Sequence, residues 1–189
     1  MASSKREQLV DTATALFYKH GYHATGIDRI LAESGVAKMT LYKYFRSKDE
    51  LILAVLRRRD EGFRNWLMRE VERRGATPRE RLLVMFDVLQ EWFRKNDYRG
   101  CMFINAGAEY GSPDSAIRAA ACEHKKLLGA YVEEVARDAG ASDPARLATG
   151  LMLLINGATV AAQLNCACGP AEDAKRAGAV LIADAIPVN

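Results

Sequence analysis

The sequence is poor in cysteine and proline, and it has no apolar segment near its start of the kind that directs secretion. Its 189 residues include only four cysteines and five prolines, and no apolar leader follows Met1. Cysteines at this density indicate reduced thiols, and the charged start indicates no secretion signal. Because 49% of the residues are hydrophobic, the chain can bury a core without disulfides or metals. We therefore expect a cytoplasmic protein.

The sequence also lacks an unbroken apolar run and an excess of charge. The longest apolar segment, 147–164, is interrupted by Thr149, Asn156 and Gln163, which favours a packed helix over a membrane span. The net charge is only +3, of which residues 1–50 carry +2. This balance permits nucleic-acid binding but does not demonstrate it. No alternating pattern of useful length predicts a strand.

Helix signals occur along the whole chain instead. A capping residue followed by glutamate three residues later stands at 47–50 and 77–80, and the second of these has proline at the first helical position. The Ser-Pro pair at 112–113 and the Asp-Pro pair at 143–144 are similar starts. With the apolar periodicity between them, these signals predict an all-α fold of nine helices at about 4–20, 26–33, 37–44, 48–73, 78–95, 101–110, 113–139, 143–166 and 170–185. The first three are short, so a boundary near residue 47 separates a small head (1–47) from a helical body (48–189).

The head contains two short predicted helices joined by a glycine. Thr25 and Asp28 are spaced to cap the first helix, and Gly35 supplies a turn in which a positive φ is easily adopted. Leu41 and Phe45, four residues apart, anchor the second helix against the first. Two short helices joined in this way form a helix-turn-helix.

The outward side of the second helix carries groups suited to a DNA groove: Lys38, Met39, Thr40, Tyr42 and Lys43. Lysines and a tyrosine hydroxyl reach phosphates, whereas Thr40 and Met39 are suited to base edges or a thymine methyl. From these residues alone, a solvated face on an ordinary helical hairpin explains the pattern equally well.

The segment 21–51 closely resembles the signature of the TetR family of bacterial transcriptional regulators. The matching residues are Gly21-Tyr22, Thr25, Ile30-Leu31-Ala32, Gly35-Val36, Thr40-Leu41-Tyr42, Phe45 and Ser47-Lys48-Asp49-Glu50-Leu51. The resemblance implies a nine-helix fold with a DNA-binding head and a body that binds a ligand and dimerises. It implies DNA contacts at Thr25, Lys38, Thr40, Tyr42, Tyr44 and Lys48, to which the outward side adds Met39 and Lys43.

Three residues depart from the family pattern, and one of them is Tyr44, which replaces the frequent His. Ala37 stands where the family usually has Ser or Thr, so the recognition helix loses a side-chain cap worth about 1 kcal/mol. Met39 stands where a small residue is common, and it brings a bulky apolar group toward the bases. The docking mode tolerates all three changes, but the operator sequence does not follow from the resemblance.

The body offers candidate effector contacts on its apolar helices. His124 lies among hydrophobic neighbours on one face, where a buried histidine satisfied by a polar group and a ligand contact are both reasonable interpretations. Most of the aromatic candidates are equally well explained as core. The candidate effector-binding residues are Trp66, Phe86, Leu89, Trp92, Phe93, Cys101, Asn105, Glu109, His124, Leu128, Tyr131 and Asn156.

Cysteine supplies two alternatives to a ligand-released regulator. The segment Gly100–Tyr110 is similar to the Gly-Cys segment of one TetR branch, and in some relatives a cysteine there reports oxidants or electrophiles, although the burial preference of free cysteine favours a tight buried corner for Cys101. A thiol enzyme using Cys101 and His124 is the other alternative, but no nucleophile motif supports it, and we expect no enzymatic activity and no cofactor. Cys166 and Cys168 are too close together to indicate a zinc site, and we interpret them as a helix end.

Small residues recur at helical spacing in the last two predicted helices, 143–166 and 170–185. The resemblance implies that these helices form a homodimer seam, which places two recognition helices about one DNA turn apart for a palindromic operator. The sequence therefore predicts a dimeric, effector-responsive regulator of double-stranded DNA without a membrane partner. Repression is the commoner behaviour in the family.

Overall fold

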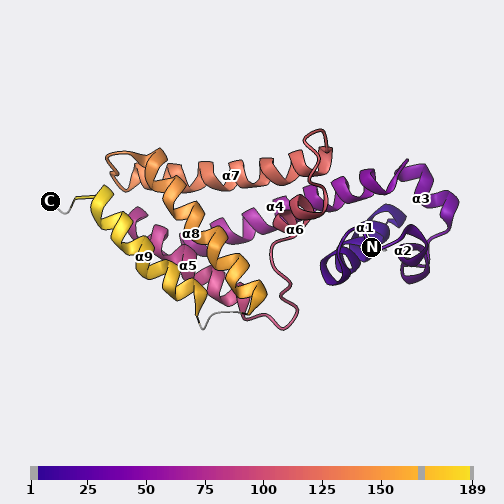
Figure 1. Ribbon diagram of the computed structural model, residues 1–189, viewed down its shortest axis with the longest axis horizontal. Coiled ribbons are helices and arrows are strands. Elements are labelled where there is room, and N and C mark those ends of the chain that lie inside the picture. The colour runs from indigo at the N-terminus through magenta and orange to yellow at the C-terminus, as the bar shows by residue number, and fades with distance from the viewer. Residues whose placement is uncertain (1–3, 166–168, 188–189) are drawn as a thin grey trace. The chain divides into compact units, whose positions relative to one another are not determined.

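The computed structural model describes residues 4–165 and 169–187, and these residues form nine α-helices and no strand (Figure 1). The predicted all-α fold of nine helices is therefore confirmed. The helices are α1 (Lys5–His20), α2 (Ile27–Ser34), α3 (Lys38–Tyr44), α4 (Lys48–Arg74), α5 (Pro78–Phe93), α6 (Met102–Glu109), α7 (Ala116–Asp138), α8 (Pro144–Leu164) and α9 (Pro170–Ala185).

Local capping explains most of these boundaries. At α5 the Thr77 side chain accepts from the Glu80 backbone N–H, and the Glu80 carboxylate accepts from the Thr77 N–H, which completes the predicted box. At α8 the Asp143 side chain accepts from the Arg146 N–H at 3.0 Å. Both starts are where the sequence places them.

Among the boundaries that differ from the prediction, the start of α7 and the end of α5 have a clear local cause. The helix expected from residue 113 begins at Ala116, because Ser112 accepts from the Ser115 N–H at 3.1 Å and closes a separate turn first. The Ser115 side chain then accepts from the Arg118 N–H at 3.3 Å. The helix expected to reach residue 95 ends at Phe93. There the Lys95 N–H donates to the Trp92 carbonyl, three residues earlier, in place of the four-residue spacing of an α-helix.

The chain divides into two compact units, each containing residues distant in sequence. The first combines the described residues up to Glu61 with Met102–His124, and the second combines Gly62–Cys101 with the described residues from Lys125 onward. Helices α4 and α7 contribute to both units. The predicted boundary at residue 47 separates a DNA-binding segment from the rest of the chain, which these compact units do not test, so it stays a prediction.

The first unit is built on α1. This helix packs against α2 and α3 and buries Leu9, Leu16 and Phe17. Ile30 of α2 and Leu41 of α3 are fully buried. The three helices of the head therefore share one small core, which fixes the orientation of α3.

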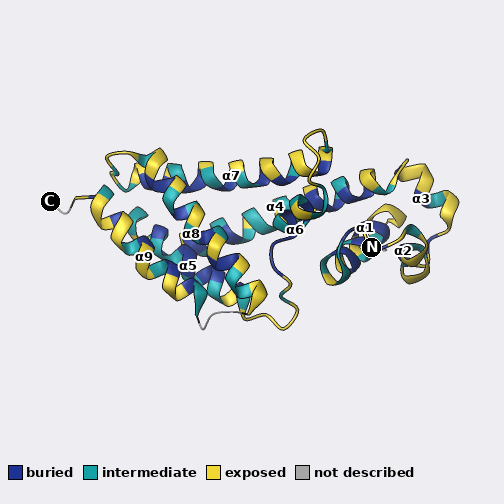
Figure 2. Ribbon diagram, in the orientation of Figure 1, coloured by how far each residue is buried: buried dark blue, intermediate teal, exposed yellow. Residues whose placement is uncertain are grey.

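The second unit is built on α5, which packs against α8 and α9. Buried and exposed positions alternate along these helices with helical periodicity (Figure 2). Gly178 of α9 lies so close to α5 that an added Cβ would be 3.0 Å from Cε2 of Phe86. The small residue thus permits the close approach of α9 to the aromatic ring.

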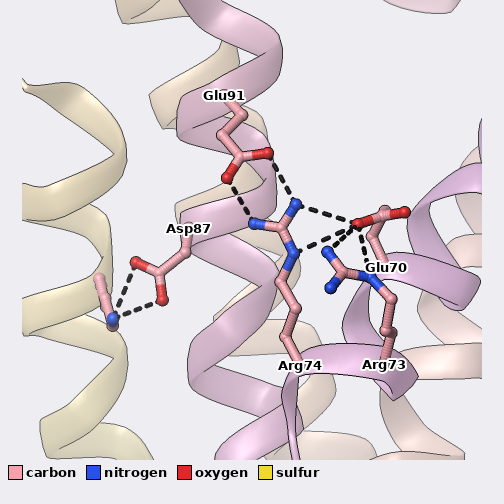
Figure 3. Close-up of polar contacts among 6 residues, drawn as sticks. Glu70, Arg73, Arg74, Asp87 and Glu91 are labelled. Carbon is pink, nitrogen blue, oxygen red and sulfur yellow. Dashed lines mark hydrogen bonds and ion pairs between the residues drawn. The ribbon is translucent and has the colours of Figure 1, made fainter.

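Ion pairs connect the helices of the second unit at its surface (Figure 3). Arg74 of α4 donates to Glu70 on its own helix at 3.0 Å and to Glu91 of α5 at 2.7 Å. Lys175 of α9 donates to both carboxylate oxygens of Asp87 on α5, at 2.7 and 2.8 Å. Hydrogen bonds from Arg73 and Arg74 lower the pKa of Glu70. Because these groups are partly exposed, each ion pair contributes little to the stability of the fold.

The glycine that ends α4 provides a test of this packing. An added Cβ at Gly75 would lie 2.8 Å from the backbone N of Arg81, whereas one at Gly62, inside α4, would meet none of the described atoms within 4 Å. We expect Gly75→Ala to lower the free energy of unfolding by about 1–3 kcal/mol because the turn must shift. We expect Gly62→Ala to raise it by up to about 1 kcal/mol through helix propensity. Thermal denaturation measures both, and equal melting temperatures for the two variants would contradict the packing.

Candidate DNA-binding surface and effector residues

Helix α3 presents an exposed polar face from the head. Leu41 and Phe45 are buried and hold the helix against α1, and the N–H of Phe45 closes it by donating to the Leu41 carbonyl. Thr40 is half-buried. The remaining predicted DNA contacts on α3 are all exposed: Lys38, Met39, Tyr42, Lys43 and Tyr44.

The turn before α3 has the expected geometry. Gly35 adopts the left-handed conformation (φ +64°, ψ 18°), and its N–H donates to the Leu31 carbonyl at 3.0 Å. Ala37 is the N-cap of α3 and provides no side-chain hydrogen bond. The loss of the cap predicted from the sequence is therefore present in the structure.

Thr25 has a different role from the one its position suggests. Gly26, not Thr25, is the N-cap of α2, and no side chain caps this helix, so the capping prediction is wrong. The Thr25 side chain is fully buried, and its hydroxyl donates to the Gly21 carbonyl at 2.8 Å. Thr25 thus fixes the segment between α1 and α2, and its hydroxyl does not reach the surface.

Lys48 lies at the start of α4, beside the same segment. Its Nζ donates to the His23 carbonyl at 3.4 Å. Partial burial lowers the pKa of Lys48, against the opposing effect of the Glu109 and Asp49 carboxylates. Arg46, two residues earlier, is exposed and was not among the predicted contacts. The only sequence signal that would have suggested Arg46 as a DNA contact is its position between α3 and α4.

Helix α6 is bonded at both ends to the segment that joins α1 and α2. The two carboxylate oxygens of Glu109 accept from the backbone N–H groups of Tyr22 and His23, at 2.9 and 2.6 Å. The His23 ring is 2.9 Å from the Glu109 carbonyl through Nε2 and stacks on Tyr110 with centroids 4.6 Å apart. At the other end of α6, the buried Tyr22 hydroxyl donates to the Met102 carbonyl at 3.0 Å. The prediction that Glu109 contacts an effector gains no support, because both of its oxygens already bind the head.

His124 of α7 is buried beside a carboxylate from α4. Its Nδ1 lies 2.7 Å from Oδ1 of Asp60, its ring stacks on Phe103 of α6 at 3.6 Å, and it is 2% exposed. The geometry favours the interpretation of a buried histidine satisfied by a polar neighbour. Sequence reasoning missed Asp60, because it follows three arginines in what resembles a solvated helix face. Asn105, another candidate, lies half-buried on α6.

An aromatic cluster gathers three of the candidates in the second unit. The Trp92 ring lies 4.9 Å from Phe63, 5.6 Å from Phe93 and 5.1 Å from Tyr98. Trp66 packs on Phe63 at 5.5 Å, and the Lys95 ammonium lies 5.4 Å from its centroid. Trp66, Trp92 and Phe93 are thus brought together, with Phe63 and Tyr98 completing the cluster.

The other candidates of the second unit do not form one site among the described residues. Phe86, Leu89 and Leu128 are buried in its core. The Asn156 side-chain oxygen accepts from Lys125 Nζ at 2.7 Å. Cys101 is 6% exposed, and Cys166 and Cys168 lie outside the described residues.

Tyr131 of α7 differs from these because it buries a polar atom. Its hydroxyl has no hydrogen-bond partner within the described ranges, and burial raises the pKa of Tyr131 to about 12. A buried hydroxyl of this kind is suited to a polar group of a bound molecule.

Two family models match the chain. Residues 9–55 match bacterial regulatory proteins of the tetR family, and residues 78–177 match the tetracyclin repressor-like C-terminal domain. The second match alone covers more than half of the sequence. The first contains the helix-turn-helix described above.

Solved and curated proteins agree with these matches. The crystal structure of a TetR-family transcriptional regulator from Streptomyces coelicolor has a TM-score of 0.87 at 31% identity, covering 96% of this chain and 95% of that one. The HTH-type transcriptional activator FasR of Mycolicibacterium smegmatis is 31% identical over 72% of this chain and 61% of its own. The HTH-type transcriptional repressor KstR2 of Mycobacterium tuberculosis is 34% identical over 44% and 42%. The chain spans only 55–61% of the length of the first curated relatives.

The fold and the exposed helix-turn-helix thus define a helical transcriptional regulator with a DNA-binding head. The chain belongs to the TetR family. The recognition made from residues 21–51 is confirmed.

The buried pair of Asp60 and His124 provides a test of the first unit. Asp60→Ala removes a carboxylate from a histidine that is almost fully buried, so we expect the free energy of unfolding to fall by about 2–4 kcal/mol. Asp11, which pairs with Arg58 at 2.6 Å on the exposed side of α1, is the matched control. Asp11→Ala is expected to cost less than about 1 kcal/mol. Urea denaturation measures both, and equal losses of unfolding free energy would contradict a larger stabilising contribution from the buried pair.

Proposed function

We propose that this protein binds a palindromic DNA operator as a homodimer in the cytoplasm and that a small-molecule effector releases it. The exposed face of α3 carries the proposal, because the core of the head orients the polar side chains of this helix outward. Repression is the commoner family behaviour and is our proposal for the sign, although the relatives include a named activator and a named repressor. These relatives are regulators, and we propose no enzymatic activity.

The proposed DNA contacts divide by chemistry. The hydroxyl of Tyr42 and the ammonium of Lys48 bind phosphates, and the start of α4 adds the favourable dipole of a helix N-terminus. Lys38, Lys43 and Tyr44 contribute further backbone contacts, while Thr40 and Met39 face the bases. Thr25 contributes by holding the segment that precedes α2.

The exposed apolar residues of α8 and α9 support the homodimer. Leu153, Val160 and Leu164 lie on one side of α8 at spacings of seven and four, and Leu153 is 68% exposed. Val180 and Leu181 of α9 are also exposed. Of the described helices, α8 is long and apolar enough to cross a membrane. Because only a third of its most apolar 18-residue window is buried, most of that apolar surface is left to be covered. A second copy of the chain would cover this surface, as usual for the family.

Release requires that the effector favour a different position of the heads. Effector binding in the body would shift α4 or α6, and the bonds from Glu109 and Met102 would carry the motion of α6 to the head. A coupling of about 1–3 kcal/mol changes operator affinity about 5- to 150-fold. The aromatic cluster and Tyr131, both in the second unit, are the effector contacts that we propose to test first. The burial of Cys101 gives no support to the oxidant-sensing alternative.

Operator binding by the head is tested with two variants. We expect Tyr42→Phe to weaken binding about 100-fold or more, because each of the two subunits loses a hydrogen bond to a charged phosphate, worth about 1.5–3 kcal/mol. We expect Lys48→Ala to weaken binding and to reduce the slope of log K against log salt by about 2 per dimer. Gel-shift titrations at several salt concentrations measure both effects. The control is Lys126→Ala, an exposed lysine on α7, and unchanged binding by both head variants would overturn the proposal.

The dimer seam is tested by placing a charge on α8. Leu153→Arg is expected to convert a dimer to a monomer at micromolar concentration, because arginine would be buried without a partner between subunits. Leu127→Arg, which changes another exposed leucine on α7, is expected to leave the dimer intact. Analytical ultracentrifugation distinguishes the two species. A dimeric Leu153→Arg protein would exclude this seam, and a monomeric wild type would exclude the homodimer.

A further inference from the structure

We propose that Met39 selects one thymine in each operator half-site by packing against its 5-methyl group. This inference rests on the proposed binding of DNA by α3 and adds the base that the helix reads. Met39 is 87% exposed, the highest value among the large hydrophobic residues of the described chain. An apolar side chain exposed on the face proposed to enter the groove is available to pack against an apolar group of the DNA.

The fold points this side chain outward. Met39 is the second residue of α3, and the next residues toward the core, Leu41 and Phe45, are buried. The Gly35 turn and Val36, which is also buried, fix the start of the helix. The methionine therefore lies on the same exposed face as the lysines and Tyr42. Its position is fixed by the buried residues that anchor α3, not by contacts of the methionine side chain.

The chemistry of the neighbours assigns base reading to Met39. Lysine ammonium groups attract phosphates of every sequence, so they contribute affinity without selecting a base. The Met39 thioether has no hydrogen-bond donor and is only a weak acceptor. It cannot distinguish bases by hydrogen bonds, and a polar base edge covered by it would lose water without a replacement partner.

Only one group in the major groove suits such a side chain. The four base pairs present donors and acceptors there, and the 5-methyl group of thymine is the apolar exception. Methionine is flexible and polarisable, which lets its terminal methyl adapt to this contact. A T·A pair at the position facing Met39 is therefore favoured over the other pairs.

The size of the effect follows from the area of one methyl group. Burial of a methyl-sized apolar group corresponds to about a fourfold change in affinity. A symmetric dimer makes the contact twice, so removal of both methyl groups is expected to weaken binding about 15-fold.

The experiment uses the full chain and an operator selected from random duplex DNA. Symmetric pairs of thymines in the selected operator are replaced in turn by deoxyuridine, which removes only the methyl group. Wild-type protein is expected to lose about 15-fold in affinity at one pair of positions. Met39→Ala is expected to bind the thymine and uracil operators equally at that pair. Thermal denaturation confirms that this exposed substitution leaves the fold intact.

A second substitution and a second base separate selection from general affinity. Lys43→Ala is expected to weaken both operators by the same factor and to keep their ratio. When the T·A pair is replaced by C·G, 5-methylcytosine is expected to recover part of the lost affinity for wild type but not for Met39→Ala. Uracil sensitivity that persists in Met39→Ala, or its absence from wild type, overturns the inference while operator binding stands. Failure to select any operator overturns the proposed function and this inference with it.

Discussion

The bond between the Glu109 carboxylate and two backbone amides of the head is the interaction on which the first unit depends. The N–H groups of Tyr22 and His23 follow Gly21, where α1 has ended and φ is +86°, so no helix supplies them with an acceptor. Glu109 accepts from both through charge-assisted hydrogen bonds, each worth about 1.5–3 kcal/mol. Displacement of α6 would leave two donors unsatisfied and would break the buried bond of Tyr22 to Met102. The position of α6 and the shape of the head are therefore linked.

This link has a consequence for regulation. Helix α4, which extends from Lys48 to Arg74, is the direct covalent connection between the head and the rest of the chain. The contacts of Glu109, Tyr110 and Met102 give a second route, through α6. Lys48, a proposed phosphate contact, lies beside the same segment and donates to His23. A shift of α6 would thus act on this proposed phosphate contact as well as on the backbone.

The local features of the fold were predictable because their causes are local. Capping boxes act over three residues, helical periodicity over three or four, and the Gly35 turn over one. These distances explain why Thr77, Asp143 and Gly35 perform the predicted roles. Prediction failed where local signals compete: Ser112-Pro113 and Ser115 are both capping sites, and the chain uses Ser115 for the helix. At Thr25 the hydroxyl donates to the Gly21 carbonyl at 2.8 Å, whereas in a cap its oxygen would accept from a backbone N–H of α2.

The candidate sites divide in the same way. The outward side of α3 follows from its own sequence, because burial of Leu41 and Phe45 leaves only one direction for Lys38, Met39 and Tyr42. By contrast, the pairing of His124 with Asp60 spans 64 residues, and that of Glu109 with Tyr22 spans 87. Charged residues on helix surfaces resemble one another in sequence, so nothing local distinguishes Asp60 from Asp11. The sequence by itself determined the helices, the family and the outward face of α3, whereas only tertiary packing decided which buried polar groups meet, because their partners come from distant helices.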